Sequence, residues 1–281
     1  ILKFSHMLIN EKNKSIAALF ISALFFGSTF LIVKNLLDTF SPTFVVFLRY
    51  IIAAFIFGLI GGIPNKIAWK PGILMGFSLW LGYVTQTQGL VTTSTINSGV
   101  VTGFYIVLTP FLSKLFNNTD LKTKNYIYSI LGFTGIVLIS INDISQVFGN
   151  LFTLICAAAY AMHIVLVERY VKNQNISQLM FVQSLTGSIL CLPLISLSEF
   201  VFLPEYLFPV IFLGLVVNVG AFYLQLYGQK LIQASTSALI LSLEAIFALL
   251  IGILVANEFL NLLNWFGVIL VLISIYLVIK E

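Results

Sequence analysis

Ten stretches of the chain are almost entirely apolar, and only short polar breaks separate them. A helix needs about 20 apolar residues to cross the roughly 30 Å hydrocarbon core of a bilayer. Each stretch is close to this length, so the sequence predicts ten transmembrane helices. They lie near residues 15–37, 42–61, 72–91, 96–116, 125–142, 150–168, 176–197, 206–228, 235–256 and 262–279. No break between them is long enough for a soluble domain.

The scarcity of charge leads to the same class of protein. Only 9% of the 281 residues are charged and the mean hydropathy is +1.06, whereas a soluble domain has about 25% charged residues. The net charge of +4 is modest, and no Lys/Arg cluster resembles a nucleic-acid-binding surface. We therefore expect an all-α integral membrane protein that contacts the lipid bilayer and no nucleic acid.

The distribution of basic residues predicts the orientation of the chain. With the N-terminus inside, twelve of the fourteen lysines and arginines fall on the inner side. These are Lys3, Lys12, Lys14, Lys66, Lys70, Lys114, Lys122, Lys124, Arg169, Lys172, Lys230 and Lys280. Lys34 falls outside, and Arg49 falls within a span. Because cytoplasmic loops are enriched in Lys and Arg, both termini are expected to be cytoplasmic.

A weak internal repeat divides the chain into two halves. At an offset of 134, "FFGSTFLIVKN" lies over "AYAMHIVLVER", and at an offset of 139, Gln86 and Gly89 lie over Gln225 and Gly228. The ten predicted spans also divide into five and five. Since five is odd, two consecutive halves enter the membrane in opposite directions, which is an inverted repeat. The predicted halves are residues 1–143 and 144–281.

Several segments resemble one known family across nearly the whole chain. They are "FFGSTFLIVKN", "GLVTTSTINSGVVTGFYIVLTP", "ASTSALILSLEAIFALLIGILVANE" and "WFGVILVLISIYLV". Together they are similar to EamA-type transporters of the drug/metabolite transporter superfamily. The resemblance implies a bacterial inner (plasma) membrane and a central cavity between the halves, with the fifth and tenth spans more peripheral. The family often has proline after the glutamate of the ninth span, where this chain has Ala245.

Two charged residues lie deep in predicted spans, and both are candidates for a substrate site. A charge at this depth costs roughly 2.5 to 3.5 kcal/mol and usually faces the protein interior. Under the repeat, Arg49 corresponds to Gln183, and Glu244 corresponds to Tyr105. Because both halves are polar at these positions, we expect all four residues to face the interior. Arg49 and Glu244 either form a structural ion pair, or bind a substrate carboxylate and an amino group or proton, respectively.

Six further residues within spans are candidates for lining the cavity. They are Gln86, Gln225, His163, Tyr83, Tyr160 and Tyr223. The glutamines either contact substrate or bond helices together, and the histidine either relays protons or packs. The tyrosines either line an aromatic cavity or face lipid and core.

The leading hypothesis is a secondary transporter (permease) that moves a small metabolite, such as an amino acid or a relative, by alternating access. Proton coupling and facilitated transport both remain open. An exporter of drugs or nucleotide derivatives is the alternative, and a non-transport membrane protein is less favoured. We predict no enzyme, cofactor or metal site, because the chain has no G-x-x-x-x-G-K-[ST], H-E-x-x-H or G-x-S-x-G motif. Cys156 and Cys191 lie in apolar runs without ligand spacing.

Overall fold

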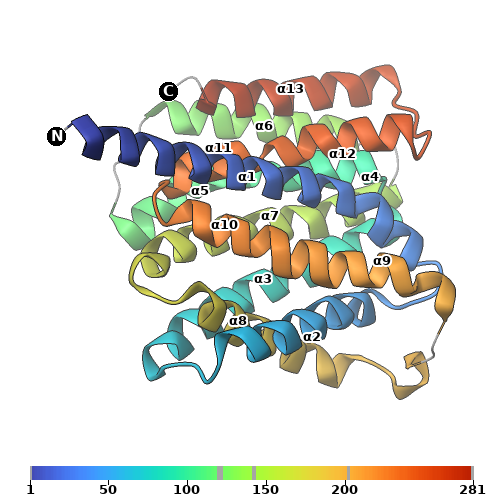
Figure 1. Cartoon of the computed structure of the whole chain (residues 1–281). Coiled ribbons are helices and arrows are strands. Elements are labelled where there is room, and N and C mark those ends of the chain that lie inside the picture. The colour runs from blue at the N-terminus through green and yellow to red at the C-terminus, as the bar shows by residue number, and fades with distance from the viewer. Residues whose placement is uncertain (1, 119–122, 141–143, 201–202, 280–281) are drawn as a thin grey trace.

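Long helices run along one another through the molecule (Figure 1). The computed structural model describes residues 2–118, 123–140, 144–200 and 203–279, and within these ranges it contains no strand. The α-helices are α1 (Leu2–Leu36), α2 (Pro42–Gly61), α3 (Lys66–Thr92), α4 (Thr95–Thr102), α5 (Tyr105–Asn117), α6 (Thr123–Ser140), α7 (Ile144–Tyr170), α8 (Ile176–Cys191), α9 (Leu207–Ile211), α10 (Phe222–Gln229), α11 (Ala234–Leu241), α12 (Leu243–Leu254) and α13 (Leu262–Ile279). A π-helical segment, Phe212–Ala221, joins α9 to α10. The predicted boundary between the halves, at residue 143, lies outside the described residues.

Seven helical segments within the described ranges are long and apolar enough to cross a membrane. They are Asn10–Leu36, Pro42–Gly61, Thr95–Asn117, Gln146–Asn173, Ile176–Leu194, Pro204–Gln229 and Ala234–Leu254. All seven coincide with predicted spans, which confirms a multi-pass, all-helical membrane protein. The other three predicted spans fall on α3, α6 and α13, so the total of ten crossings stays a prediction.

Local sequence signals explain where α2 and α3 begin. The Ser41 side chain accepts a hydrogen bond from the backbone of Phe44, and Pro42 occupies the first turn of α2, as is favourable at a helix start. α3 begins at Lys66, six residues before the predicted start at residue 72, and contains Pro71. Pro71 is the sixth residue of α3, so it lacks the N–H that would otherwise donate to the Ile67 carbonyl four residues earlier.

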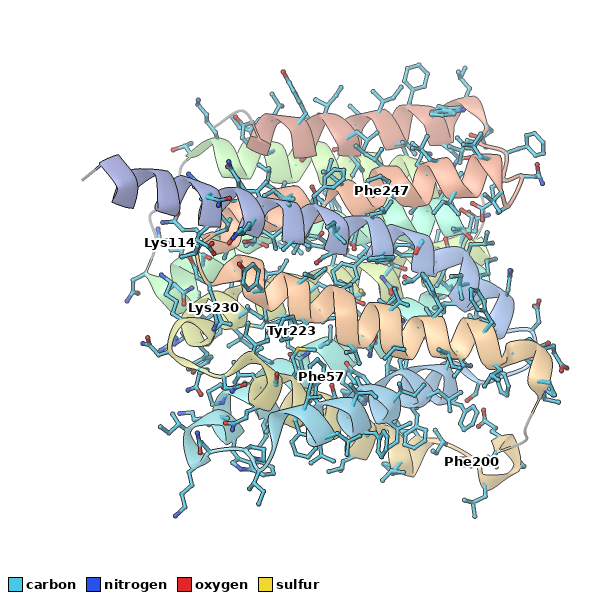
Figure 2. All side chains as sticks on the ribbon, viewed as in Figure 1. Phe57, Lys114, Phe200, Tyr223, Lys230 and Phe247 are labelled. Atoms are coloured by element: carbon cyan, nitrogen blue, oxygen red, sulfur yellow. The ribbon has the colours of Figure 1, made fainter. Side chains whose placement is uncertain are left out.

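The helices pack in pairs that join the two halves of the chain. α3 packs along α7, α2 along α8, and α6 along α13, while α1 contacts both α10 and α12. α6 and α13 lie side by side at one edge of the bundle (Figure 1), in agreement with the peripheral position that the resemblance implied. α1 begins and α13 ends at the same end of the bundle, where Lys114 and Lys230 also lie (Figure 2).

Small residues let α4 and α12 approach closely. A Cβ atom on Gly103 would lie 2.9 Å from the Cβ atom of Ala245, and one on Gly99 would overlap the side chain of Ala248. Without a hydrophobic force between helices in lipid, such close van der Waals packing is what holds membrane helices together. This contact fixes the helix that carries Glu244.

Charged side chains satisfy the backbone at the turn between α3 and α4. Glu258 accepts hydrogen bonds from the backbone nitrogens of Thr95 and Ile96, at 2.7 and 2.9 Å. Lys34 donates to the carbonyl oxygens of Leu90 and Thr93, at 3.2 and 2.5 Å. An anion at a helix N-terminus and a cation at a C-terminus both complement the helix dipole.

Glu199 plays a similar part at the start of α2. Its two carboxylate oxygens accept from the backbone nitrogens of Ser41 and Ser196, at 3.0 and 3.2 Å. Burial alone would raise the pKa of Glu199, but hydrogen bonds from Ser41 and Ser196 outweigh it and hold the pKa below its ordinary value. The loop before α9 is thus tied to α2 through a carboxylate that stays ionised at neutral pH.

We expect Glu258→Ala to lower the free energy of unfolding by about 1–2 kcal/mol, because two backbone donors at the start of α4 lose their acceptor. Thermal unfolding of the purified protein in detergent measures this change. Glu205→Ala serves as the matched control, since Glu205 is an exposed acid on another loop. Equal melting temperatures for the two variants would contradict the capping role.

Candidate functional site

An internal cavity lies where α1, α2, α3, α5, α7, α10 and α12 meet. Its lining residues are Phe26, Thr29, Phe30, Arg49, Leu79, Tyr83, Gln86, Tyr105, Tyr160, His163, Ile164, Phe222, Gln225, Leu241 and Glu244. The space open to the centre of a water-sized sphere is about 30 Å³, enough for about two water molecules. In this conformation the cavity is therefore much smaller than the pockets of about 300–1,000 Å³ that hold small-molecule ligands.

Two spans with an irregular helical turn near their middle place polar groups at the cavity. α4 ends and α5 begins around Gly103 and Phe104, and α11 gives way to α12 at Ser242. Tyr105 is the first residue of α5, and Glu244 is the second residue of α12. The backbone keeps helical angles through both turns, and short-range hydrogen bonds such as Val107 N to Phe104 O and Ala245 N to Ser242 O continue across them, so Thr95–Asn117 and Ala234–Leu254 each form one span.

Arg49 is 2% exposed and is held by two neighbours. Its Nε donates to Oδ1 of Asn218 at 3.2 Å, and its Nη2 donates to the Tyr83 hydroxyl at 2.5 Å. The Tyr83 hydroxyl in turn donates to Asn218 Oδ1 at 2.8 Å. The guanidinium carbon also lies 3.8 Å from the centre of the Tyr83 ring, a distance typical of a cation–π contact.

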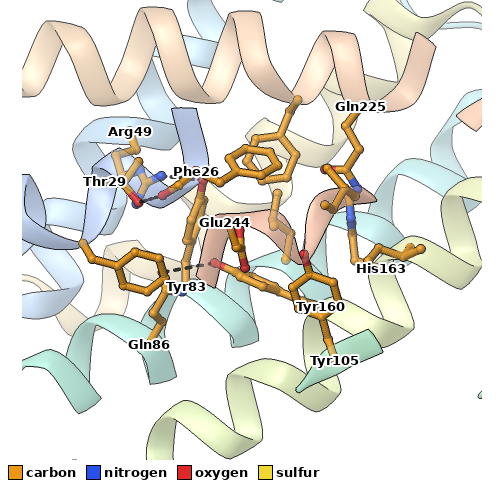
Figure 3. A pocket seen from close by; sticks show the side chains of 15 residues that line it. Phe26, Thr29, Arg49, Tyr83, Gln86, Tyr105, Tyr160, His163, Gln225 and Glu244 are labelled. Atoms are coloured by element: carbon orange, nitrogen blue, oxygen red, sulfur yellow. Dashed lines mark hydrogen bonds between the residues drawn. The ribbon is translucent and has the colours of Figure 1, made fainter. Parts of the chain in front are cut away.

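Three buried polar atoms at the cavity have no hydrogen-bond partner within the described part of the protein: Nη1 of Arg49, Oε1 of Glu244 and the hydroxyl oxygen of Tyr105. All three side chains are at most 3% exposed. Figure 3 shows Glu244 pointing into the cavity, with Arg49 on one side and His163 on the other. Since buried polar groups are almost always paired, these atoms are suited to a ligand's polar groups.

Arg49 and Glu244 line the same cavity but do not form an ion pair. Within the described residues, the salt bridge observed is between Lys14 and Glu11, near the start of α1. The structure therefore does not contain the direct contact that the ion-pair alternative requires.

We expect Glu244→Gln to change the free energy of unfolding by less than about 1 kcal/mol. Breaking a buried ion pair by removing one partner costs about 3–5 kcal/mol, whereas the unpartnered carboxylate has no such pair to lose. Thermal unfolding of this variant, of Arg49→Gln and of the double variant measures the coupling. A large loss in Glu244→Gln that the double variant restores would contradict the observed separation.

The two glutamines line the cavity as predicted, and both are hydrogen-bonded. Gln86 donates to the Thr102 hydroxyl at 3.2 Å and accepts from the Tyr160 hydroxyl at 3.3 Å, which links α3 to α4 and α7. Gln225 donates to Gln229 at 3.0 Å within the α10 region. The hydrogen bonds of Gln86 fit the alternative in which the glutamines link helices. Its position in the lining is equally compatible with contact to a ligand.

The structure brings His163 to the cavity but places Gln183 behind it. Nε2 of His163 lies 2.9 Å from Oε1 of Gln183. Gln183 is 1% exposed and faces the interior as predicted, yet it does not belong to the lining. Gln183 thus reaches the cavity only through the imidazole of His163, and its role as a site residue stays a prediction.

Tyr83 and Tyr160 line the cavity, whereas Tyr223 does not. Tyr223 is 38% exposed, and its ring stacks on that of Phe57 at a centroid distance of 6.4 Å. Its neighbour Phe222 faces the cavity instead. Tyr223 therefore lies outside this cavity, and its role as a site residue stays a prediction. Adjacent residues on a helix point about 100° apart, so only one of the two could face inward.

Sequence reasoning missed Asn218, Thr29 and Phe26. Asn218 is a lone polar residue in the apolar run "FLGLVVNVGAF", and this isolation is the signal that could have identified it. Thr29 and Phe26 lie over His163 and Tyr160 at the offset of 134, so the repeat itself pointed to them.

Neither cysteine forms part of a site. Cys156 and Cys191 are both free and buried. Across the described ranges, no group of three His, Cys, Asp or Glu side chains is placed to hold a metal ion. The site is thus built from one cation, one carboxylate, amides and aromatic hydroxyls.

A multi-pass helical bundle with buried, unpartnered polar and ionisable groups around an internal cavity is characteristic of membrane transporters. The chain belongs to the EamA-like transporter family, whose model matches residues 13–141 and again residues 147–280. This match confirms the resemblance drawn from the sequence.

Several individual proteins are similar to the chain. An uncharacterized transporter of Archaeoglobus fulgidus is 30% identical over 260 residues, which cover 91% of this chain and 82% of the relative. The S-adenosylmethionine uptake transporter of Rickettsia bellii is 24% identical over 195 residues, or 66% of this chain and 64% of the relative. A solved crystal structure with 17% identity aligns with a TM-score of 0.68 over 94% of this chain and 96% of that one, which supports the fold alone.

Proposed function

We propose that the protein is a secondary transporter of a small metabolite that carries both a carboxylate and an amino group, such as an amino acid or a relative. The observation that carries this proposal is the set of unpartnered atoms at one cavity, Nη1 of Arg49 and Oε1 of Glu244 above all. A guanidinium binds a carboxylate with strong, charge-assisted hydrogen bonds. A carboxylate does the same for an ammonium group, so the two residues complement a zwitterion.

Alternating access in this proposal comes from two inverted repeats of five spans each, residues 1–143 and 144–281. The family model matches twice along the chain, and α3, α6 and α13 supply the three spans that complete the ten. The helix contacts are reciprocal between the halves. α1 packs on α10 and α12, as α7 packs on α3 and α5, while α2 meets α8 and α6 meets α13.

The cavity itself supports this symmetry. Twelve of its fifteen lining residues form six pairs at the offsets of 134 and 139 found in the sequence. The pairs are Phe26 with Tyr160, Thr29 with His163, Phe30 with Ile164, Tyr83 with Phe222, Gln86 with Gln225, and Tyr105 with Glu244. The break at Gly103 also maps onto the break at Ser242 at the offset of 139. A binding site on the axis that relates two repeats is what inverted-repeat transporters use.

The orientation follows from the lysines. With both termini in the cytoplasm, the end of the bundle that carries Lys114 and Lys230 (Figure 2) is the cytoplasmic end of the protein in a bacterial inner membrane. Glu258 and Lys34 then hold the turn between α3 and α4 at the outer end.

A nucleoside derivative that is also an amino acid is a second candidate for the cargo. Six aromatic side chains line the cavity, and among them those of Phe26, Tyr83, Tyr160 and Phe222 would stack on a planar base. The similar protein of Rickettsia bellii is named for S-adenosylmethionine, a compound with an amino acid portion and an adenosyl group. This candidate retains the roles of Arg49 and Glu244.

Uptake into proteoliposomes tests the proposal. We expect saturable flux of at least one compound among the proteinogenic L-amino acids and S-adenosylmethionine, and its loss by more than tenfold in Arg49→Ala. Saturable flux of none of them would refute the proposed cargo.

An imposed pH gradient separates proton coupling from facilitation: a Glu244→Gln variant that still accumulates cargo against its gradient would exclude Glu244 as the proton carrier.

A matched pair of tyrosine variants tests the cavity separately. We expect Tyr105→Phe to raise the KM for the transported compound about tenfold, because one hydrogen bond to cargo of about 1–1.5 kcal/mol is lost. Tyr223→Phe should leave KM unchanged, since Tyr223 lies outside the cavity. Initial uptake rates over a range of cargo concentrations measure both, and equal effects of the two substitutions would contradict the assignment.

A further inference from the structure

Asn218 occupies a position that the substrate site depends on without belonging to its lining. It is 2% exposed and lies in the π-helical segment Phe212–Ala221. Such segments are rare and occur mostly at functional sites. Asn218 is contributed by the second half of the chain, whereas its two partners, Arg49 and Tyr83, come from the first half.

The hydrogen bonds around Asn218 form a closed ring of three residues. Its Oδ1 accepts from Arg49 Nε at 3.2 Å and from the Tyr83 hydroxyl at 2.8 Å, and that hydroxyl accepts from Arg49 Nη2 at 2.5 Å. The ring uses Nε and Nη2 of the guanidinium and leaves Nη1 without a partner. Because a guanidinium is planar and rigid, holding two of its nitrogens determines where the third one points.

The neutrality of Asn218 has its own consequence. An aspartate has nearly the same shape and would accept the same two hydrogen bonds, but it would pair with Arg49 and cancel its charge. The amide fixes the guanidinium geometrically and leaves the positive charge in place. Among the side chains that the structure describes, no carboxylate lies within ion-pair distance of Arg49.

We propose that Asn218 is a positioning residue that sets the transporter's specificity for an anionic group: it orients Arg49 through Nε and leaves Nη1 and the charge for the carboxylate of the cargo. This inference rests on the proposed function, in which Arg49 binds that carboxylate. Asn218 acts through Arg49 and does not contact the cargo. Because its amide is uncharged, Arg49 keeps the positive charge that an anionic cargo requires.

The test compares Asn218→Asp with the wild type in proteoliposomes, using the L-amino acid that the wild type transports fastest and its primary carboxamide. We expect Asn218→Asp to raise the KM for the amino acid more than tenfold, with less than a threefold change in the maximal rate. The KM for the carboxamide, which has no carboxylate, should change less than twofold. A purely structural role would alter both compounds alike.

Asn97→Asp is the matched control, because Asn97 is a buried asparagine that bonds to Gln146, away from Arg49. It should leave the KM for the amino acid unchanged. If Asn218→Asp does not reach the membrane, Asn218→Leu is tested instead. This substitution removes the hydrogen bond to Arg49 but leaves its positive charge. We then expect a smaller, three- to fivefold rise in KM for the amino acid and no change for the carboxamide. Unchanged KM in a folded Asn218 variant, or equal changes for acid and amide, would overturn the inference.

A stability measurement distinguishes failure of this inference from failure of the proposed function. Asn218→Asp should raise the melting temperature in the wild-type background, where it pairs with Arg49, and lower it in an Arg49→Gln background. If this pattern holds while the wild type transports no amino acid, the geometry stands and the proposed cargo is wrong. If it does not hold, Asn218 does not control the charge of Arg49, whatever the protein transports.

Discussion

Lipid offers no hydrogen bonds, so every polar group within this bundle depends on a partner that the protein itself provides. Most groups have one. Lys34 and Glu258 serve the backbone between α3 and α4, and Asn218 holds Arg49. Within the described residues, eleven buried side-chain atoms have no hydrogen-bond partner, and three of them, Arg49 Nη1, Glu244 Oε1 and the Tyr105 hydroxyl, lie at one cavity. Their shared location makes this cavity the candidate site of the molecule.

The contacts that satisfy these groups also connect the two halves of the chain. Asn218 reaches Arg49 from the second half, and Glu258 reaches the start of α4 in the first half. The polar contacts that organise the site are thus also contacts between the two halves of the chain.

The proposed repeats share a scaffold but differ in chemistry. Paired positions from both halves line the cavity, but the side chains at these positions differ. Tyr105 in the first half corresponds to Glu244 in the second, and Arg49 corresponds to Gln183, which lies outside the lining. Similar scaffolds allow two conformations of comparable energy, which alternating access requires. In the proposed function, the different side chains give the site a direction, with an anion-binding end at Arg49 and a cation-binding end at Glu244.

The sequence by itself determined the class of protein, the helical segments and the inward location of Arg49 and Glu244, because the length of apolar runs and the cost of a charge in lipid are local properties. Only the tertiary structure decided that these two residues do not pair, that Phe222 rather than Tyr223 faces the cavity, and that Gln183 lies behind His163. It also revealed Asn218 as the partner of Arg49. These outcomes depend on the rotation of each helix and on contacts between residues more than a hundred positions apart, which periodicity and spacing along one chain do not specify.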